Sequence, residues 1–291
     1  MITLFNNGKE LLEICNSENK KIHEVVLEKE KKATGRSIED IRKLMRENLK
    51  TMVESSNYAL NKKINSVSGL IGGEANKVKK YSQNNKTLCG DIINTAMARA
   101  LSTSEVNASM GKIVAAPTAG ASGILPSAIL TTAEKFNLDE EEIINGLFTA
   151  AGIGEIVAKN ATVSGAYGGC QAECGVGAAM ASAAIVEMLG GSPETCLHAS
   201  SIAIINILGL VCDPIAGLVE FPCALRNASG VINALTSADL ALAGIESLIP
   251  FDEVIEAMYK VGKSLPDSLK ETALGGLAAT PTGECLKNKV L

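Results

Sequence analysis

Three observations predict a mainly α-helical fold for this 291-residue chain. Hydrophobic residues make up 46% of the sequence, yet there is no Trp and there are only five Phe and four Tyr. The interior must therefore be filled by Ala, Leu, Ile, Val, Met and Gly, a small-residue mixture that suits closely packed helices. Apolar residues also recur at helical spacing, and capping signals mark several helix starts. We expect one compact helical domain with Gly/Pro-rich loops.

Residues 1–65 are predicted to form a charged N-terminal helical segment. Of the 27 Lys and Arg residues, 18 fall in residues 1–99, where they alternate with Glu. The clearest helix opens at Ser37-Ile38-Glu39-Asp40, a capping-box pattern. It is followed by apolar residues at helical spacing: Ile38, Ile41, Leu44, Met45, Leu49 and Met52. A Ser/Gly-rich break over residues 66–73 separates this segment from residues 66–291, the predicted main domain.

The buried core is expected between residues 100 and 225, which contain only three Lys and no Arg. A helix is predicted to begin after Asn137, with Asp139 and Glu140 in its first turn. Ser192-Pro193-Glu194 supplies an N-cap, a first-turn Pro and an acid, and Gly190-Gly191 closes the preceding helix.

The C-terminal part is predicted to contain two further helices, over residues 239–248 and 252–261. A glycine-broken segment over residues 272–278 follows them.

Composition also bears on location and partners. The formal charge of −5 and the lack of a basic patch interleaved with aromatic residues argue against nucleic acid as a partner. The N-terminus lacks a signal-peptide pattern, and the longest apolar stretches are too short to span a membrane. A cytoplasmic protein is expected, in which eight Cys residues stay reduced and serve as ligands or as small buried side chains.

Cysteine must carry any metal site, because His23 and His198 are the only histidines and His198 is expected to be structural. Cys170, Cys212 and Cys223 each lie beside Gly or Pro in a predicted loop. Their separations of 42 and 11 residues are unlike the compact spacing of ferredoxins. By spacing alone, a shared metal site and buried free thiols both remain open.

The other cysteines are interpreted as follows. Cys174 lies four residues after Cys170, so the two could face one side of a helix, or Cys174 could simply pack. Three more are taken as structural: Cys15, Cys89 and Cys196.

The small-residue loop over residues 110–126 feeds a helix and could hold a carboxylate through its backbone N–H groups. It lacks the ending of a phosphate-binding loop, and Gly175-Val176-Gly177 matches a dinucleotide fingerprint only superficially. Tight packing is the alternative for both segments.

Six short motifs together resemble the iron–sulfur L-serine dehydratases. In chain order these are Ser68-Gly69-Leu70-x-Gly72-Gly73, Ala116-Pro117-Thr118-Ala119-Gly120, Gly169-Cys170-Gln171, Gly209-Leu210-Val211-Cys212-Asp213-Pro214, Pro222-Cys223 with Arg226-Asn227, and Gly275-Gly276-Leu277-Ala278. Their order is that of the family, and the resemblance extends from about residue 1 to residue 285.

The resemblance implies that Cys170, Cys212 and Cys223 hold a [4Fe–4S] cluster in a catalytic domain over residues 66–291. One iron is then left without a protein thiolate. This iron is expected to bind the serine hydroxyl and carboxylate as a Lewis acid while a base removes the Cα proton. Aminoacrylate would leave and hydrolyse through an imine to pyruvate and ammonia.

Two departures from single-chain members are visible. Their regulatory and substrate-binding domain, with its Ser-Ser-Ser-His-Thr motif, has no counterpart here, so a β chain is expected as a partner without which the chain is inactive. Some members end in a cysteine that folds back onto the open iron. Cys285 lies near that position, although the chain runs on to Leu291, and is a possible fourth ligand.

The catalytic base is not identified by the sequence. Lys112 and Lys159 are candidates within this chain, and a base from the partner is the alternative. Resemblance and polarity within apolar loops select the expected substrate-binding residues, each of which could equally be a turn or cap residue: Ser68, Thr118, Gly120, Asn160 and Ser164.

Three other functions compete with serine deamination. The same cluster could serve a lyase acting on cysteine or threonine, or a non-catalytic subunit that senses redox state. A pyridoxal-phosphate dehydratase is disfavoured because no lysine lies in a persuasive cofactor-binding context.

Overall fold

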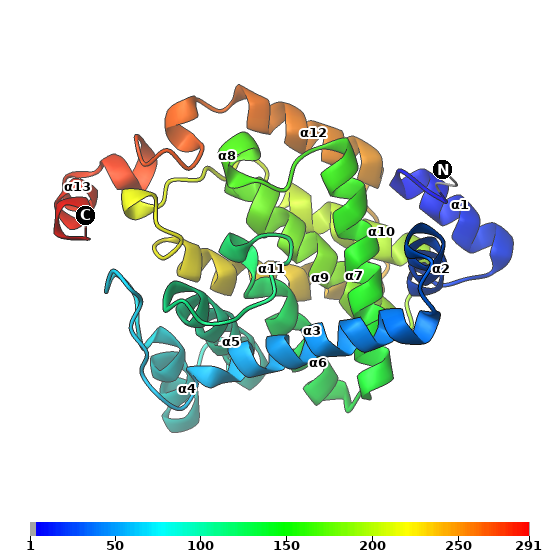
Figure 1. The fold of residues 1–291 in the computed structure, drawn as a ribbon, viewed down its shortest axis with the longest axis horizontal. Coiled ribbons are helices and arrows are strands. Elements are labelled where there is room, and N and C mark those ends of the chain that lie inside the picture. Colours follow the sequence, from blue (N-terminus) through cyan, green and yellow to red (C-terminus); the bar gives the residue numbers. More distant parts are fainter. Residues whose placement is uncertain (1–3, 291) are drawn as a thin grey trace.

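The computed structural model describes residues 4–290, and all of its regular secondary structure is helical (Figure 1). The α-helices are α1 (Gly8–Glu18), α2 (Ile22–Thr34), α3 (Ile38–Tyr58), α4 (Glu74–Asn84), α5 (Gly90–Ala108), α6 (Ile124–Phe136), α7 (Glu140–Asn160), α8 (Gly165–Gly168), α9 (Val176–Met188), α10 (Pro193–Ile205), α11 (Cys223–Leu242), α12 (Phe251–Ser264) and α13 (Pro281–Val290). Short 3₁₀ or π turns are η1 (Ala119–Ala121), η2 (Gln171–Gly175), η3 (Ile215–Gly217), η4 (Asp267–Leu269) and η5 (Gly276–Ala279). The mainly α prediction is confirmed.

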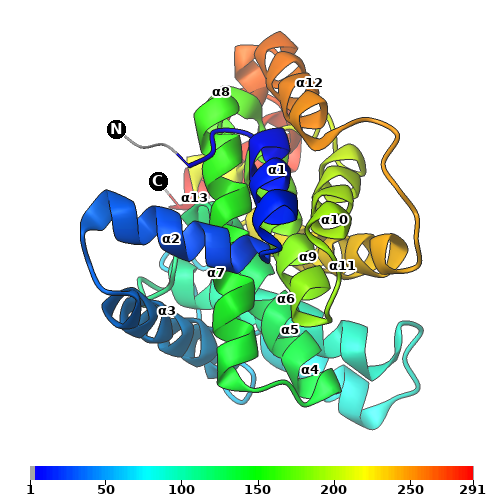
Figure 2. The same ribbon diagram turned by 90° about the vertical axis from the view of Figure 1, so that its right-hand side faces the viewer.

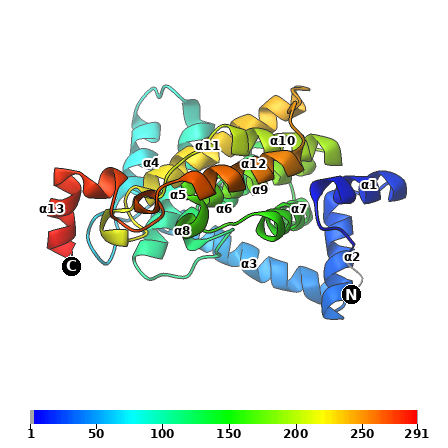
Figure 3. The same ribbon diagram turned by 90° about the horizontal axis from the view of Figure 1, so that it is seen from above.

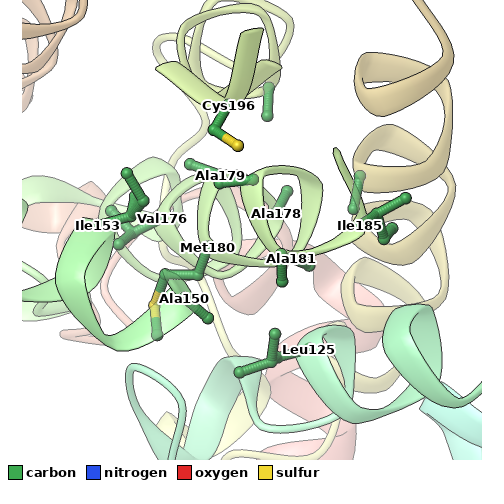
Figure 4. Packing of buried hydrophobic residues seen from close by; sticks show 14 of the residues in the cluster. Leu125, Ala150, Ile153, Val176, Ala178, Ala179, Met180, Ala181, Ile185 and Cys196 are labelled. Atoms are coloured by element: carbon green, nitrogen blue, oxygen red, sulfur yellow. The ribbon is translucent and has the colours of Figure 1, made fainter. Parts of the chain in front are cut away.

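Helix α9 is the centre of the fold. It is buried along its whole length and packs against α6, α7, α10 and α11 (Figures 1 and 2). Alanines dominate its surface, and Figure 4 shows Ala178, Ala179 and Ala181 among larger side chains from neighbouring helices. Alanine is the strongest helix former and its small side chain lets adjacent helices approach closely. The low charge of residues 100–225 therefore correctly marked the core.

The N-terminal helices join this core. Ser37 caps α3 by accepting a hydrogen bond from the Asp40 amide at 3.1 Å, as the capping pattern predicted. The apolar stripe of α3 is narrower than expected, because Ile38 and Leu44 are 40% and 43% exposed. The main hydrophobic core combines residues from both sides of residue 65, including Phe5 and Ile153. The division of the chain into an N-terminal segment and a main domain at residue 65 stays a prediction.

The helix boundaries follow their capping signals, with one exception. Asp139 and Glu142 form a capping box at the start of α7, and Ser192 caps α10 through the Thr195 amide. The separate helix predicted over residues 239–248 is wrong. The buried stripe of α11 continues through Ala238 and Ala241, so Asp239 lies inside this helix and the chain turns only at Gly244, where φ is +88°.

The two ends of the chain lie at opposite ends of the molecule. Helix α13 is at one side and α1 at the other in Figures 1 and 3. Between them, α12 packs on α8 and α10, and α13 packs on η3 in the segment that precedes α11 (Figure 1). Within residues 4–290, no helix is both long enough and apolar enough to cross a membrane.

The packing of α9 leads to a stability prediction. Ala181 is fully buried and lies near Leu125 (Figure 4). Ala181→Leu would add three heavy atoms to a space without room for them, and should lower the free energy of unfolding by about 1–3 kcal/mol. Chemical denaturation would measure this. The matched control Ala33→Leu, at an exposed position of α2, should leave stability nearly unchanged; equal effects in the two variants would contradict this account of the core.

Glu105 of α5 is a buried acid away from the cysteines. It is fully buried and accepts a hydrogen bond from the Ala75 amide at 2.9 Å, and the Glu74 carboxylate lies close by. Burial, reinforced by the charge of Glu74, raises the pKa of Glu105 to about 7. The folded chain therefore holds this proton to a higher pH than the unfolded chain, whose carboxyl releases it near 4.5.

The free energy of unfolding should consequently fall as the pH rises between about 4.5 and 7. Glu105→Gln keeps the oxygen that accepts from Ala75 and removes the titration. Relative to the wild type, this variant should gain stability on going from pH 5 to pH 8, as measured by thermal unfolding. Glu54→Gln, at an exposed position of α3, is the control. A parallel response of Glu105→Gln and wild type would show that Glu105 does not titrate in this range.

Candidate metal and substrate site

Cys170 lies at the junction between α8 and α9. Gly169, with φ at +76°, precedes it, and a Cβ there would lie 2.7 Å from the Leu210 carbonyl oxygen. Cys170 was predicted in a loop, but it caps the π turn η2 that runs directly into α9. Such turns often re-aim side chains at functional sites. The sulfurs of Cys170 and Cys174 lie 3.4 Å apart in a hydrogen bond, so these two cysteines do face one side.

Gln171, next to Cys170, fixes this turn to the rest of the molecule. Its side-chain amide donates to the carbonyls of Gly168 and Met258 at 2.9 and 3.0 Å. Its side-chain oxygen accepts from the Gly209 amide at 2.8 Å. A fully buried, fully bonded amide of this kind holds its segment in one position. Cys170 is therefore tied to both α12 and the segment that carries Cys212.

Cys212 lies in an extended segment paired with the C-terminal part of the chain. Its amide donates to the Leu269 carbonyl at 2.9 Å, and its carbonyl accepts from the Glu271 amide at 2.7 Å. The neighbouring Asp213 pairs with Arg226 of α11 at 2.7 Å. Arg226 also donates to the Val211 carbonyl, at 2.9 Å.

The second oxygen of Asp213 accepts from the Leu277 amide at 2.7 Å. The Asp213 side chain passes close to Gly276, where a Cβ would meet it at 2.3 Å. The motif over residues 275–278 thus packs directly on the Cys212 segment.

Cys223 is the first residue of α11. Asn227, one turn later, donates to the carbonyls of Gly120 and Cys223 and accepts from the Gly123 amide. Glu220, in the loop before Cys223, accepts a short hydrogen bond from the Ser68 hydroxyl. These contacts bring the loops of residues 66–73 and 116–123 against the cysteine that begins α11.

The three predicted ligands are brought together. Cys170 and Cys212 are each 3% exposed and Cys223 is half-buried. Burial raises the pKa values of Cys212 and Cys223, that of Cys223 to about 12, and the charge of Cys170 raises both further. The hydrogen bond from Cys174, followed by the charge of Arg226, lowers the pKa of Cys170. The thiols are close enough to repel one another when ionised, a repulsion that a bound metal group would relieve.

This donor set fits a cluster better than a single ion. Among residues 4–290, no three His, Cys, Asp or Glu side chains are arranged as ligands of one metal ion. In an iron–sulfur cluster each thiolate binds a different iron, so the sulfurs need not converge on one point. Three neighbouring cysteine thiols are the donor type that an iron–sulfur cluster uses.

Glu173 is the residue that the sequence interpretation missed. It lies in η2, three residues after Cys170, and is 8% exposed. Its carboxylate accepts from the Thr118 hydroxyl at 2.7 Å, and one of its oxygens is 3.8 Å from the Cys212 sulfur. Burial raises the pKa of Glu173. The sequence signal that could have identified Glu173 is an acidic residue between two cysteines in an otherwise apolar run.

The predicted substrate-binding residues divide into two groups. Thr118 and Gly120 lie at the Glu173 carboxylate, Ser164 caps α8 immediately before Gly165, and Ser68 binds Glu220. Asn160 instead donates to the carbonyls of Asn6 and Ile156 at the end of α7.

The other candidates lie apart from the thiols. Lys159 pairs with Glu155 at 2.7 Å, and Lys112 is exposed. Cys285 is exposed on α13, whose contact with η3 links it only indirectly to the Cys212 segment.

Comparisons with known proteins identify the family of the chain. The family described as "Serine dehydratase alpha chain" matches residues 17–278. The chain is 52% identical over 288 residues to the "L-serine dehydratase, alpha chain" of Peptoniphilus asaccharolyticus, covering 99% of each protein. It is 49% identical to the "Probable L-serine dehydratase, alpha chain" of Bacillus subtilis (strain 168), covering 99% of this chain and 95% of the relative.

A longer relative is also matched. The "L-serine dehydratase" of Helicobacter pylori (strain J99 / ATCC 700824) is 36% identical over 95% of this chain, which spans 62% of that protein. An all-helical fold with a buried cysteine site and a family match over most of the length define the class: the chain belongs to the serine dehydratase α-chain family.

The close approach at Gly165 gives a test of the site. A Cβ at Gly165 would lie 2.5 Å from a Glu173 oxygen and 3.0 Å from the Cys212 sulfur. Gly165→Ala should displace one or both groups and reduce metal content or activity by about 10–100-fold, as supporting residues of metal sites do. Iron analysis and pyruvate assay would measure this.

Gly177→Ala is the control, because its Cβ would lie 3.3 Å from the flexible end of Ile124 and in ordinary contact with Ala121 and Ala116 at 3.5 and 3.6 Å. If Gly165→Ala kept full metal content and activity, the packing described here would not be that of the working site.

Proposed function

We propose that this chain is the α chain of an L-serine ammonia-lyase, which converts L-serine to pyruvate and ammonia with a [4Fe–4S] cluster held by Cys170, Cys212 and Cys223. The observation that carries the proposal is the meeting of these three thiols, from separate segments, beside one buried carboxylate. The names of the relatives supply the substrate.

The cluster, when bound, supplies an iron without a protein thiolate that acts as a Lewis acid toward the substrate hydroxyl. The chain itself holds the cysteine-bearing segments in fixed positions. Gln171, Asp213 and Asn227 each lie near one of the cysteines and are bonded to a different part of the fold. Because these hydrogen bonds join different segments of the fold, they hold the three cysteines in fixed relative positions.

The polar groups that remain near the thiols are suited to binding a small amino acid. Thr118 donates its hydroxyl to Glu173, and Ser164 precedes Gly165, which with Gly120 packs closely against the Glu173 carboxylate. Lys112 and Lys159 stay candidates for the base, but each lies on the surface. We therefore favour a base from the partner chain.

A β chain completes the proposed enzyme. Two relatives are named as α chains, and this chain covers only 62% of the longer Helicobacter pylori relative. The remaining part of such a protein is what a separate β chain would provide here. A cytoplasmic location is part of the same proposal, in keeping with eight free thiols.

Substitution of single cysteines tests the proposal. Purified without oxygen and with its β chain, the wild type should contain iron and sulfide, absorb in the visible range, and release pyruvate from L-serine. Cys170→Ala, Cys212→Ala and Cys223→Ala should each remove the chromophore and the activity. Cys196→Ala, which changes a buried cysteine of the core, and Cys89→Ala, at an exposed cysteine, should retain both.

Each competing function predicts a different result. A redox-sensing subunit would keep the chromophore but release no pyruvate. A lyase for another substrate would turn over L-threonine or L-cysteine faster than L-serine. Activity that survives air and follows a pyridoxal spectrum would overturn the cluster assignment.

A further inference from the structure

Glu173 is a buried carboxylate without a cationic partner in the part of the chain that the structure describes. Its polar contacts are the Thr118 hydroxyl at 2.7 Å and the Cys212 sulfur at 3.8 Å. The positive charge of Arg226 acts on Glu173, but that guanidinium is bonded to Asp213 and the Val211 carbonyl. A carboxylate can accept about four hydrogen bonds, so Glu173 can accept further hydrogen bonds from a ligand.

Three other glutamates in the described part of the chain are buried. Glu105 also lacks a cationic partner; it accepts from the Ala75 amide and lies close to Glu74. Glu187, 5% exposed, binds the His23 ring at 2.6 Å and the Ile22 amide at 3.1 Å. Glu220 accepts from both the amide and the hydroxyl of Ser68. Burying a carboxylate is costly unless it is paired and hydrogen-bonded. Glu173 lies beside the thiols, where a bound ligand could supply the positive charge that the carboxylate lacks.

Two glycines pack closely against the Glu173 carboxylate. At Gly120 a Cβ would lie 3.0 Å from one oxygen, and at Gly165 a Cβ would lie 2.5 Å from the other. Any residue larger than glycine at either position would press on the carboxylate. Meanwhile Thr118 fixes the orientation of the group by donating to one oxygen. The result is a buried acid that Thr118 orients and two glycines approach closely, next to the proposed metal ligands.

We propose that the Glu173 carboxylate binds the α-ammonium group of the amino-acid substrate. This inference rests on the proposed function. It makes Glu173 the residue that selects an α-amino acid over an α-hydroxy acid. An ammonium has three N–H donors and forms charge-assisted hydrogen bonds with a carboxylate. A hydroxyl in the same place brings no charge and leaves the buried acid unpaired.

The test uses the iron-loaded α chain with its β chain, carrying Glu173→Gln or Glu173→Asp. Gln keeps the size and the acceptor for Thr118 but loses the charge, whereas Asp keeps the charge on a shorter side chain. Equilibrium dialysis would measure the binding of L-alanine, which has the ammonium, and of L-glycerate, which has a hydroxyl in its place. Iron content, KM and kcat for L-serine would be measured on the same preparations.

Glu173→Gln should weaken alanine binding by about 10- to 100-fold and raise the KM for serine similarly. Glycerate binding should change less than about 3-fold, because no ammonium contact is lost. Glu173→Asp should recover part of the alanine affinity. Iron content should stay at the wild-type level in both variants.

Three results would overturn the inference. Equal weakening of alanine and glycerate would mean that Glu173 only shapes the pocket. A fall in kcat with unchanged alanine binding would place Glu173 in the chemical step instead. Loss of iron would make it a supporting residue of the metal site. If the wild type forms no pyruvate, the proposed function fails, while the two dialysis measurements still decide whether Glu173 recognises an ammonium.

Discussion

The ion pair between Arg226 and Asp213 is the contact on which the site depends most. It joins the start of α11, just after Cys223, to the residue that follows Cys212. The same aspartate holds the Leu277 amide, and the same arginine holds the Val211 carbonyl. A largely buried ion pair contributes little net stability, but it penalises any arrangement that leaves one partner unpaired. Its main effect is therefore to select one relative position of three chain segments.

The packing of α9 explains why these three chain segments can be held rigidly. Helix α9 is packed on all sides by small and branched side chains, and the π turn bearing Glu173 is continuous with its first residue. Cys170 is thus attached to the most buried element of the protein. The other two thiols approach it from segments bound by buried hydrogen bonds, so contacts within the chain fix the relative positions of the three thiols.

This preorganisation has an electrostatic consequence. Bringing three thiols and a carboxylate together concentrates groups that become negative when they ionise, and their burial raises the pKa values of Cys212, Cys223 and Glu173. A metal cluster and an ammonium-bearing substrate are the two kinds of positive partner that would relieve this. In the proposed enzyme, metal binding and substrate recognition would both depend on this local concentration of acidic groups.

The sequence by itself determined the helical class, the central position of residues 100–225 and most helix starts, because apolar periodicity and capping are local properties that short segments express independently. It also singled out Cys170, Cys212 and Cys223, through their Gly- and Pro-marked surroundings and the family motifs. Only the tertiary structure decided which polar residues serve the site. Glu173 lies next to Cys212 across 39 positions of sequence and next to Thr118 across 55, whereas Asn160, polar and in an equally apolar region, is used to cap α7. Proximity between distant segments depends on how helices pack, and a single sequence carries no local signal for it.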